Sequence, residues 1–328
     1  MPQIDAEKRA QSLPSMPASK SKAFLKVLDD VARFARFEFA TIIFEGETGT
    51  GKNWLARMAH DLSPRRKETM LTIDLAEHSE ALIASDLFGH ERGSFTDAHT
   101  KRLGAFVTAH WSTLLIDEIG KASIAIQKHL LRAIDEHKIT PVGSDREIAV
   151  GTRILTASNE DLQSLVDRGL FLPDLYARLG LFKIRVTELR KRREDIPDLA
   201  RYFLDTFAAN TGHKPANLTI HPELMEALTQ AEWELNVRGL RNAIYRLAVQ
   251  ADPAKELTLD HCVGELEFLR TRTPGRRKKA SAEQITDTVE QSKSKAAAAR
   301  DLDISRSTLY RKLAAPGRDG PIDGSVSA

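Results

Sequence analysis

The chain has little of what marks secreted or membrane proteins. Its 328 residues include a single cysteine, Cys262, which excludes an internal disulfide and favours a reducing compartment. No apolar run approaches the roughly 20 residues that a membrane-spanning helix needs. The first residues, MPQIDAEKRAQSL, are polar and lack the apolar core of a signal peptide. We therefore expect a cytoplasmic protein without a membrane partner.

A strong charge imbalance is also missing, because 48 basic residues nearly balance 46 acidic ones and leave a net charge of +2. Net charge therefore does not by itself indicate nucleic acid or an acidic ligand as a partner. One local run differs, since RTRTPGRRKK, residues 270–279, contains no acidic side chain. Such a run could attract phosphate groups, although a solvated linker is the more common explanation.

What the sequence does contain is a regular alternation of short apolar runs and amphipathic stretches. Apolar residues at helical spacing predict a first helix over about 20–36. Five later runs have the pattern of buried strands: 40–44, 70–73, 113–116, 153–158 and 182–186. Strands that alternate with helical patterns are typical of a parallel, doubly wound sheet.

Strand signals end near residue 187, where helical patterns rich in Leu, Ala and Trp take over. These changes predict a tail (1–18), an α/β domain (19–186), a helical subdomain (187–269), a basic linker (270–280), a last helical unit (281–314) and a disordered tail (315–328). Ahead of the α/β domain we expect no segment large enough for a sensory domain.

A glycine-rich loop follows the first predicted strand and precedes a predicted helix. The loop and its first helical residues are Gly46, Glu47, Thr48, Gly49, Thr50, Gly51, Lys52 and Asn53. Glycines allow the tight turn, backbone amides can point at phosphates, and the helix N-terminus adds a positive field. We expect Lys52 to reach the β- and γ-phosphates of a nucleotide. Asn53 stands where the general motif has Ser or Thr, so the usual hydroxyl ligand of Mg²⁺ is missing.

A pair of carboxylates supplies the second half of a nucleotide site. The run TLLIDEIG, residues 113–120, is a predicted buried strand that ends in Asp117 and Glu118. We expect Asp117 to hold Mg²⁺, directly or through water, and Glu118 to polarise an attacking water. A strand that ends in two acids is a weak signal alone. Its place after a phosphate-binding loop in an alternating chain makes it a strong one.

These motifs together resemble the AAA+ activators of sigma-54 RNA polymerase, over roughly residues 15–314. The family's loop is similar to GETGTGK, and it also lacks Ser or Thr at the eighth position, where it usually has Glu. The resemblance implies an AAA+ parallel-sheet P-loop domain with a helical lid subdomain, followed by a small all-α helix-turn-helix domain. It also implies ATP and Mg²⁺ as cofactors.

Further blocks match the family in the same order. DLFGHERGSFTDA, residues 86–98, resembles the segment whose loop touches sigma-54, which implies that role for Phe95 and Thr96. TASNEDL, residues 156–162, resembles the first sensor block and implies that Asn159 senses the γ-phosphate.

The remaining blocks concern arginines. DLYARL, residues 174–179, resembles the arginine-finger segment, with Arg178 in register, and LRKRREDIP, residues 189–197, matches a family signature at most positions. WELNVRGLRN, residues 233–242, resembles the second sensor motif, in which Arg238 would reach back toward the nucleotide.

Four further positions of the α/β domain depart from the family pattern. In the sigma-54 loop, Ser94 replaces alanine and Asp97 replaces glycine, a residue that permits positive φ. Aspartate tolerates that conformation better than most residues. Leu172 stands in place of an arginine, and Asp74 stands in place of an asparagine that restrains the catalytic glutamate, so we expect Asp74 to repel Glu118. ATP binding remains expected, and hydrolysis is expected to be weakened.

The end of the chain resembles the Fis-type helix-turn-helix that closes most members of this family. ISRSTLYRKL, residues 304–313, is similar to its recognition helix, and Asp303 replaces the usual turn glycine. The residues expected on its exposed, DNA-contacting face are Arg306, Ser307, Thr308, Tyr310, Arg311 and Lys312. Such domains bind palindromic sites as dimers.

Two functions are compatible with these residues. The favoured one is a sigma-54-dependent transcription activator that hydrolyses ATP in a hexameric ring and remodels sigma-54 RNA polymerase. The alternative is an ATP-responsive DNA-binding regulator with weak or absent hydrolysis, acting as a repressor or on another polymerase form. With no sensory domain expected, control falls to another protein acting in trans or to the expression level.

Overall fold

The computed structural model describes most of the α/β domain and of the helical subdomain. The described residues are 19–77, 79–94, 98–211, 218–251, 256–266 and 268–271. Several residues singled out in the sequence lie outside this description: Phe95, Thr96, Asp97, Arg306, Ser307, Thr308, Tyr310, Arg311 and Lys312.

Five parallel strands form the central sheet, in the spatial order β2-β5-β8-β1-β9. They are β1 (Ile42–Glu45), β2 (Leu71–Asp74), β5 (Thr113–Asp117), β8 (Arg153–Ser158) and β9 (Phe182–Arg185). Each strand lies within two residues of a run that the sequence predicted, which confirms the parallel sheet. Because parallel strands run the same way, the loops that follow β1, β5 and β8 meet at one edge of the sheet.

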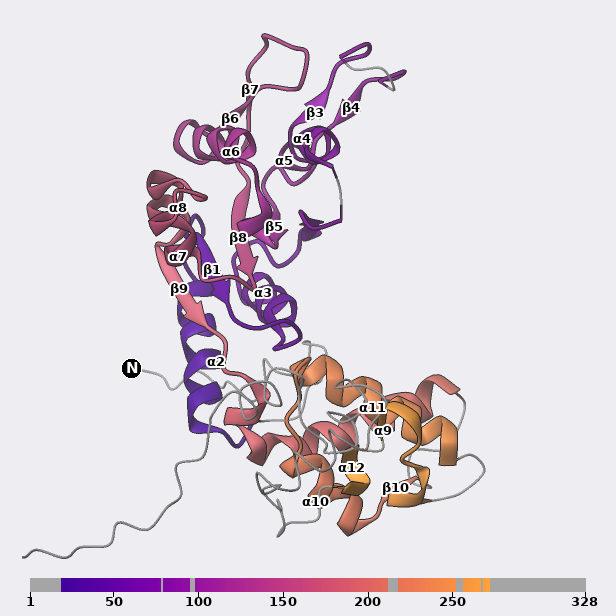
Figure 1. Cartoon of the computed structure of the whole chain (residues 1–328). Coiled ribbons are helices and arrows are strands. Elements are labelled where there is room, and N and C mark those ends of the chain that lie inside the picture. The colour runs from indigo at the N-terminus through magenta and orange to yellow at the C-terminus, as the bar shows by residue number, and fades with distance from the viewer. Residues whose placement is uncertain are drawn as a thin grey trace, which may run out of the picture. The chain divides into compact units, whose positions relative to one another are not determined.

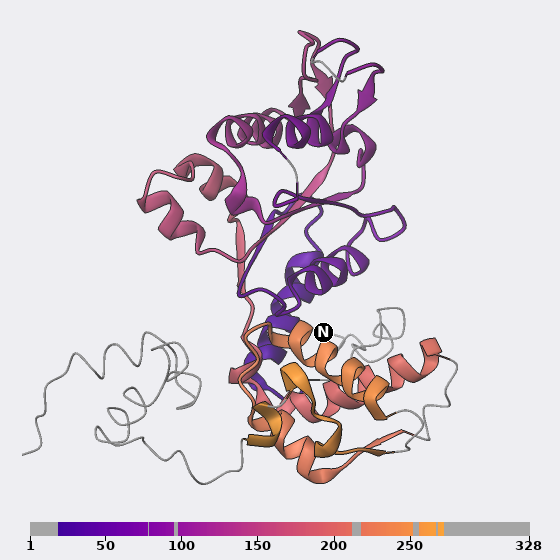
Figure 2. The ribbon, with the colours of Figure 1, turned by 45° about the vertical axis from the view of Figure 1, so that its right-hand side comes forward.

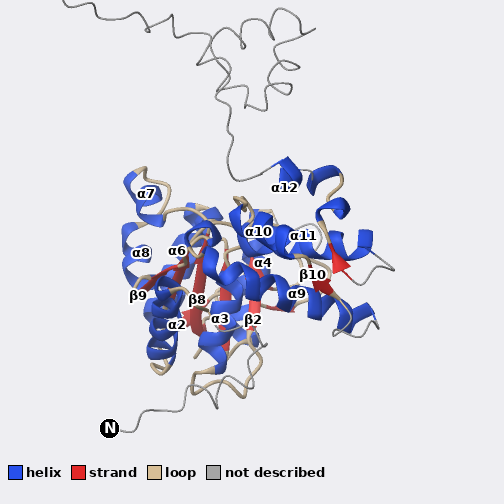
Figure 3. Ribbon diagram, turned by 90° about the horizontal axis from the view of Figure 1, so that it is seen from below, coloured by secondary structure: helices blue, strands red, loops and turns tan. Residues whose placement is uncertain are grey.

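Helices cover both faces of this sheet (Figure 1 and, seen from below, Figure 3). On one face, α2 (Lys22–Ala35) and α3 (Lys52–Asp61) share a buried cluster with β1, β8 and β9. The observed α2 confirms the helix predicted over 20–36. The other face carries α4 (Glu80–Phe88), α5 (Ala105–Thr108), α6 (Ile124–Glu136), α7 (Leu162–Asp167) and α8 (Pro173–Leu179).

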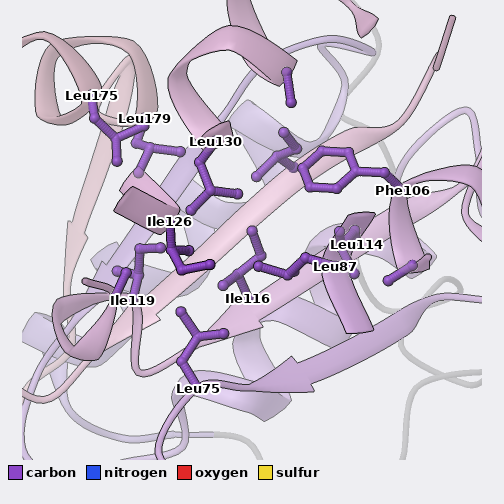
Figure 4. Close-up of a cluster of buried hydrophobic side chains, with 14 of the residues drawn as sticks. Leu75, Leu87, Phe106, Leu114, Ile116, Ile119, Ile126, Leu130, Leu175 and Leu179 are labelled. Carbon is purple, nitrogen blue, oxygen red and sulfur yellow. The ribbon is translucent and has the colours of Figure 1, made fainter. Parts of the chain in front are cut away.

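The alternation of side chains along β5 explains why the sheet needs cover on both faces. Leu114 and Ile116 belong to the cluster under α4 to α8, whereas Leu115 belongs to the cluster under α2 and α3. All three are fully buried. Figure 4 shows Ile116 beside Ile126 of α6, and Leu114 beside Leu87 of α4. A strand buried on both faces has a continuous apolar sequence, as this one has.

Two short antiparallel hairpins lie side by side beyond α4 and α6 (Figures 1 and 2). One pairs β3 (Gly89–His90) with β4 (Arg102–Leu103), and the other pairs β6 (Lys138–Ile139) with β7 (Ile148–Ala149). They are joined at Val142, whose carbonyl accepts a hydrogen bond from the backbone N–H of Glu91 at 3.0 Å. The segment expected to touch sigma-54 therefore lies between β3 and β4, and the second hairpin supports its base.

The helical subdomain has a hydrophobic core of its own, which includes Phe203, Leu240 and Leu247. Its helices are α9 (Ile196–Thr211), α10 (Pro222–Gln230), α11 (Asn236–Ala251) and α12 (Phe268–Thr271). Two two-residue strands, β10 (Thr219–Ile220) and β11 (Glu256–Leu257), pair in parallel. The prediction that strands end near residue 187 was wrong here, because two residues are too few to show a strand period.

Short 3-10 turns complete the described elements: η2 (Ile119–Lys121), η3 (Leu189–Lys191), η4 (Arg193–Asp195), η6 (Leu259–His261) and η7 (Gly264–Leu266). Among the described helices, none combines the length and apolar character that crossing a membrane requires.

Candidate nucleotide site

A cavity of about 490 Å³ opens where the carboxyl edge of the sheet faces the helical subdomain. Its walls come from the loop after β1, the start of α3, the ends of β2, β5 and β8, and helices α9 and α11. Of the residues predicted to act on the nucleotide, Lys52, Asp117, Glu118, Asn159 and Arg238 all line this cavity. The tertiary structure thus brings together residues from four separate sequence blocks.

The loop after β1 needs its glycines for two different reasons. Gly49 has a φ of +79°, and a Cβ on it would lie 2.2 Å from the carbonyl oxygen of Leu235. Gly51 has a φ of +106° and precedes the first residue of α3. The hydroxyl of Thr50 donates to the carbonyl of Glu47 at 2.8 Å and closes the turn. The loop therefore holds the backbone conformation that opens the N-terminus of α3 toward the cavity.

Lys52 is folded into this loop, with a side chain only 7% exposed. Its Nζ donates to the carbonyls of Gly46 at 2.8 Å and Glu47 at 3.3 Å. Burial lowers the pKa of Lys52, and the nearby carboxylates of Glu118 and Asp117 offset part of that effect. A desolvated ammonium at the N-terminus of a helix is suited to bind phosphate oxygens.

The two carboxylates at the end of β5 are held in different ways. Asp117 accepts hydrogen bonds from the Asn53 amide at 2.7 Å and from the backbone N–H of Glu118 at 3.0 Å. Glu118 has a φ of +53°, an uncommon conformation for a residue with a side chain, and such strain often marks functional sites. Its Oε2 accepts from the backbone N–H of Asn159 at 3.2 Å.

The pKa of Glu118 is raised, first by burial and further by the charges of Asp117 and Asp74. Asp74 pairs in register with Asp117 across β2 and β5, and its Oδ1 accepts from the backbone N–H of Ala76 at 2.8 Å. Asp74 therefore acts on Glu118 through charge, in the direction that the sequence predicted. A carboxylate with a raised pKa is a better proton acceptor than an ordinary one.

The two residues predicted to act as sensors contact the glycine-rich loop. The amide of Asn159 donates to the hydroxyl of Thr48 at 3.5 Å. The backbone N–H of Arg238, on α11, donates to the carbonyl of Gly49 at 3.3 Å. Both residues are thus placed beside the loop that would hold the phosphates.

Arg178 and Leu172 lie away from this cavity. Arg178 is near the end of α8, has a side chain 63% exposed, and pairs with Asp135 at 2.9 Å. Leu172 packs against the core under α4 to α8, and its backbone N–H donates to Gln127 at 2.8 Å. A finger role for Arg178 would therefore require the cavity of another subunit.

Sequence reasoning missed the contacts that join the helical subdomain to the loop. The carboxylate of Glu47 accepts two hydrogen bonds from Arg190, at 2.8 and 2.5 Å, and a third from Asn236 at 3.2 Å. The Arg190 guanidinium is the main reason that the pKa of Glu47 is lowered. Asn236 also donates to the carbonyl of Thr48 at 3.0 Å. The carboxylate of Glu47 thus binds the helical subdomain, while its backbone carbonyl accepts hydrogen bonds within the glycine-rich loop.

A second link runs through Arg192, whose side chain is 2% exposed. Its Nη2 donates to the carbonyl of Thr50 at 2.9 Å, and its guanidinium lies 3.7 Å from the ring centre of Phe24. Burial lowers the pKa of Arg192 to about 10. The basic block LRKRREDIP was noted in the sequence, and it was the available signal for both links.

Comparison with protein families gives three successive matches. The sigma-54 interaction domain matches residues 18–185, about half of the chain. The chain belongs to the sigma-54 activator family. The AAA+ ATPase lid domain matches residues 190–279, and the Fis family of bacterial regulatory proteins matches residues 273–315. The family, its AAA+ fold with a helical lid and its C-terminal helix-turn-helix are as the sequence predicted.

Individual relatives agree with this family. The transcriptional regulatory protein ZraR of Escherichia coli (strain K12) is 38% identical over 316 residues, which are 94% of this chain and 71% of that protein. The Nif-specific regulatory protein of Herbaspirillum seropedicae is 41% identical over 228 residues, 70% of this chain and 42% of that protein.

Solved structures of NtrX from Brucella abortus are also similar. The complex with ATP has a TM-score of 0.69 and 27% identity, and the match covers 92% of this chain and 69% of that one. The complex with ADP has a TM-score of 0.68, over 90% of this chain and 67% of that one. This activator therefore carries an AAA+ ATPase domain of a type that binds adenine nucleotides.

Proposed function

We propose that this protein binds DNA through its C-terminal domain, hydrolyses ATP in a hexameric ring, and uses that hydrolysis to remodel sigma-54 RNA polymerase at promoters. The observation that carries the proposal is the convergence of Lys52, Asp117, Glu118, Asn159 and Arg238 on one cavity. We place the protein in the cytoplasm, where the DNA and the polymerase are.

The residues present fit a nucleotide with Mg²⁺. Asp117 offers carboxylate oxygens, the kind of ligand that Mg²⁺ prefers, and Asn53 holds one of those oxygens through a hydrogen bond of 2.7 Å. Within the described residues, no three His, Cys, Asp or Glu side chains gather into a metal site of their own. This agrees with a cation that is bound by few protein groups together with substrate phosphates. Bound Mg²⁺ would neutralise charge on the β- and γ-phosphates, and Asp117 would hold it.

The protein's own groups divide the remaining work. The Lys52 ammonium, which donates hydrogen bonds to two loop carbonyls in the free protein, would donate to phosphate oxygens instead. Glu118 would orient the attacking water and accept its proton, with its carboxylate held by the N–H of Asn159 at 3.2 Å. Asn159 would thereby link the γ-phosphate to the position of the base. Arg238 would bind the phosphates from the lid side.

The proposed ring follows from the position of Arg178. This residue is exposed on α8 and is not among the described residues that line the cavity of its own chain. An arginine that acts on the γ-phosphate from a neighbouring subunit would complete the site only in an oligomer. Phe95 and Thr96, between β3 and β4, are the proposed contacts with sigma-54.

Two observations favour the alternative function, a DNA-binding regulator with weak or absent hydrolysis. Leu172, where the family has an arginine, is partly buried and packs against the hydrophobic core, so this position offers no second finger. Asp97 adds a charge to the expected sigma-54 loop.

A capture experiment separates the two functions. The purified protein, with ADP and aluminium fluoride as a mimic of the transition state, is tested for retention of sigma-54. We expect capture by the wild type, equal or stronger capture by Asp97→Gly, and no capture by Thr96→Ala. ATP turnover of Thr96→Ala should be unchanged, while its sigma-54-dependent transcription in vitro is lost. No capture by a wild type that binds ATP in the same sample would leave the alternative standing.

A further inference from the structure

The eighth position of the loop motif makes a contact that the motif does not predict. Asn53 is the second residue of α3, and Asp117 is the last residue of β5. Asn53 Nδ2 lies 2.7 Å from Asp117 Oδ2. The other oxygen, Oδ1, accepts from the backbone N–H of Glu118 at 3.0 Å. Both oxygens of the Asp117 carboxylate are therefore held before any ligand arrives.

The chemistry of this contact fixes which group donates. An ionised carboxylate can only accept hydrogen bonds, so the amide must present its N–H and not its oxygen. Asp117 is 9% exposed, and water can therefore replace this donor only in part. A carboxylate at position 53 would meet Asp117 as a like charge.

Lys52 explains why Asp117 needs to be held. Its ammonium is close enough to Asp117 and Glu118 for both carboxylates to raise its pKa against the effect of burial. It nevertheless donates to the carbonyls of Gly46 and Glu47. An unrestrained Asp117 could turn toward Lys52, and an ion pair between them would take one group from the metal and the other from the phosphates.

We propose that Asn53 is a positioning residue that fixes the Asp117 carboxylate for Mg²⁺. The inference rests on the proposed ATPase function. In the general motif, a hydroxyl at this position binds the metal itself. In this chain, the amide binds the acid that binds the metal. Asn53 occupies the position of the missing hydroxyl and contributes to metal binding indirectly, by orienting the Asp117 carboxylate.

The test measures affinity for a fluorescent ATP analogue, once with saturating Mg²⁺ and once with EDTA. For Asn53→Ala we expect a loss of about 10- to 100-fold with Mg²⁺, the usual effect of removing a group that orients a metal ligand. With EDTA, the affinity should stay within about twofold of wild type. The Mg²⁺ concentration that gives half-maximal binding should rise by the same factor.

Asn53→Asp provides a variant of the same size. It should lose at least as much Mg²⁺-dependent affinity as Asn53→Ala, because it replaces the donor with a like charge. Tighter Mg²⁺ binding by Asn53→Asp would overturn the proposal, since it would make residue 53 a direct ligand. An equal loss with EDTA and with Mg²⁺ would also overturn it, because the contact would then only shape the loop.

A matched control and the wild type complete the design. Asn242 is an exposed asparagine on α11 that does not line the cavity, so Asn242→Ala should titrate like the wild type. If the wild type fails to bind the analogue with Mg²⁺, the proposed function fails. If the wild type binds it and both Asn53 variants match the wild type, only the role of Asn53 fails. Thermal unfolding of each variant checks that it is folded.

Discussion

The two edges of the central sheet carry similar charged residues and use them differently. At the carboxyl edge, Lys52, Asp117 and Glu118 face a cavity of about 490 Å³. At the amino edge, Arg65 and Arg153 are 4% and 1% exposed. Arg65 donates there to the carbonyls that precede β5 and β8, those of Ser112 at 2.8 Å and Gly151 at 2.5 Å. A charged residue marks a binding site here only where the backbone also leaves room for a ligand.

Desolvation acts on cations at both edges. Burial lowers the pKa of Arg153 to about 10, with a further contribution from the charge of Arg65, and burial also lowers the pKa of Lys52. The buried guanidinium of Arg65 is stabilised by hydrogen bonds to backbone carbonyls and by contact with two aromatic rings, those of Phe39 and Trp111. The contacts of Lys52 within the chain compensate only part of the desolvation of its ammonium, and phosphate oxygens would compensate the rest.

The largest expected effect concerns Glu118. Glu118→Gln keeps the shape of the side chain and removes the proton acceptor, so ATP turnover should fall by about 10²- to 10⁴-fold while ATP affinity is kept. Phosphate release measures the turnover. The control is Glu38→Gln at the amino edge, where Glu38 Oε1 lies 3.5 Å from Arg65 Nε. A comparable loss of turnover in the control would contradict the conclusion that only the carboxyl edge of the sheet takes part in hydrolysis.

Lys52→Ala should come next in size. The loss of a charged hydrogen-bond donor to two phosphates is expected to weaken ATP binding by about 10- to 150-fold in an equilibrium titration. Lys138 serves as the control, because it is exposed and pairs with Glu147 at 3.0 Å outside the cavity. Unchanged affinity in Lys52→Ala would remove the loop from the nucleotide site.

At the amino edge, the expected effect is on stability. Arg65→Ala leaves the buried carbonyl of Ser112 and the partly buried carbonyl of Gly151 without this donor and should lower the free energy of unfolding by about 2–4 kcal/mol. The Tm of the nucleotide-free protein should fall by about 5–15 °C. Below that temperature, ATP affinity should match the wild type. A variant that instead kept its Tm and lost ATP affinity would show that this edge also serves the nucleotide.

The smallest effect is a pH dependence at Glu118. The pKa of Glu118 in the folded protein is raised above the usual 4.5. The folded state therefore loses stability as the pH rises through this raised pKa and the buried side chain becomes charged, whereas below 4.5 the side chain is protonated in both states and no stability is lost. Uncharged Glu118→Gln should therefore have a Tm up to a few degrees above the wild type at pH 8. The difference should vanish near pH 4. A constant difference across this range would assign it to packing or backbone strain.

The sequence by itself determined the local elements and the family. The continuous apolar run of β5, the helical spacing along α2 and the glycine pattern of residues 46–51 each depend on neighbours a few positions away. Such patterns act through the local backbone and through burial, so they can be identified without tertiary structure. The domain boundaries and the individual roles of the site residues stay predictions.

Only the tertiary structure decided which distant residues meet. Asn53 and Asp117 are 64 positions apart, and Glu47 and Arg190 are 143 apart, yet each pair is joined by hydrogen bonds. The strand order and the docking of the lid on the loop create these contacts, and no local period encodes either. The same reason separates Lys52 from Arg153. Both are cations beside apolar runs, and only their position at opposite edges of the sheet makes one a proposed ligand for phosphate and the other a part of the core.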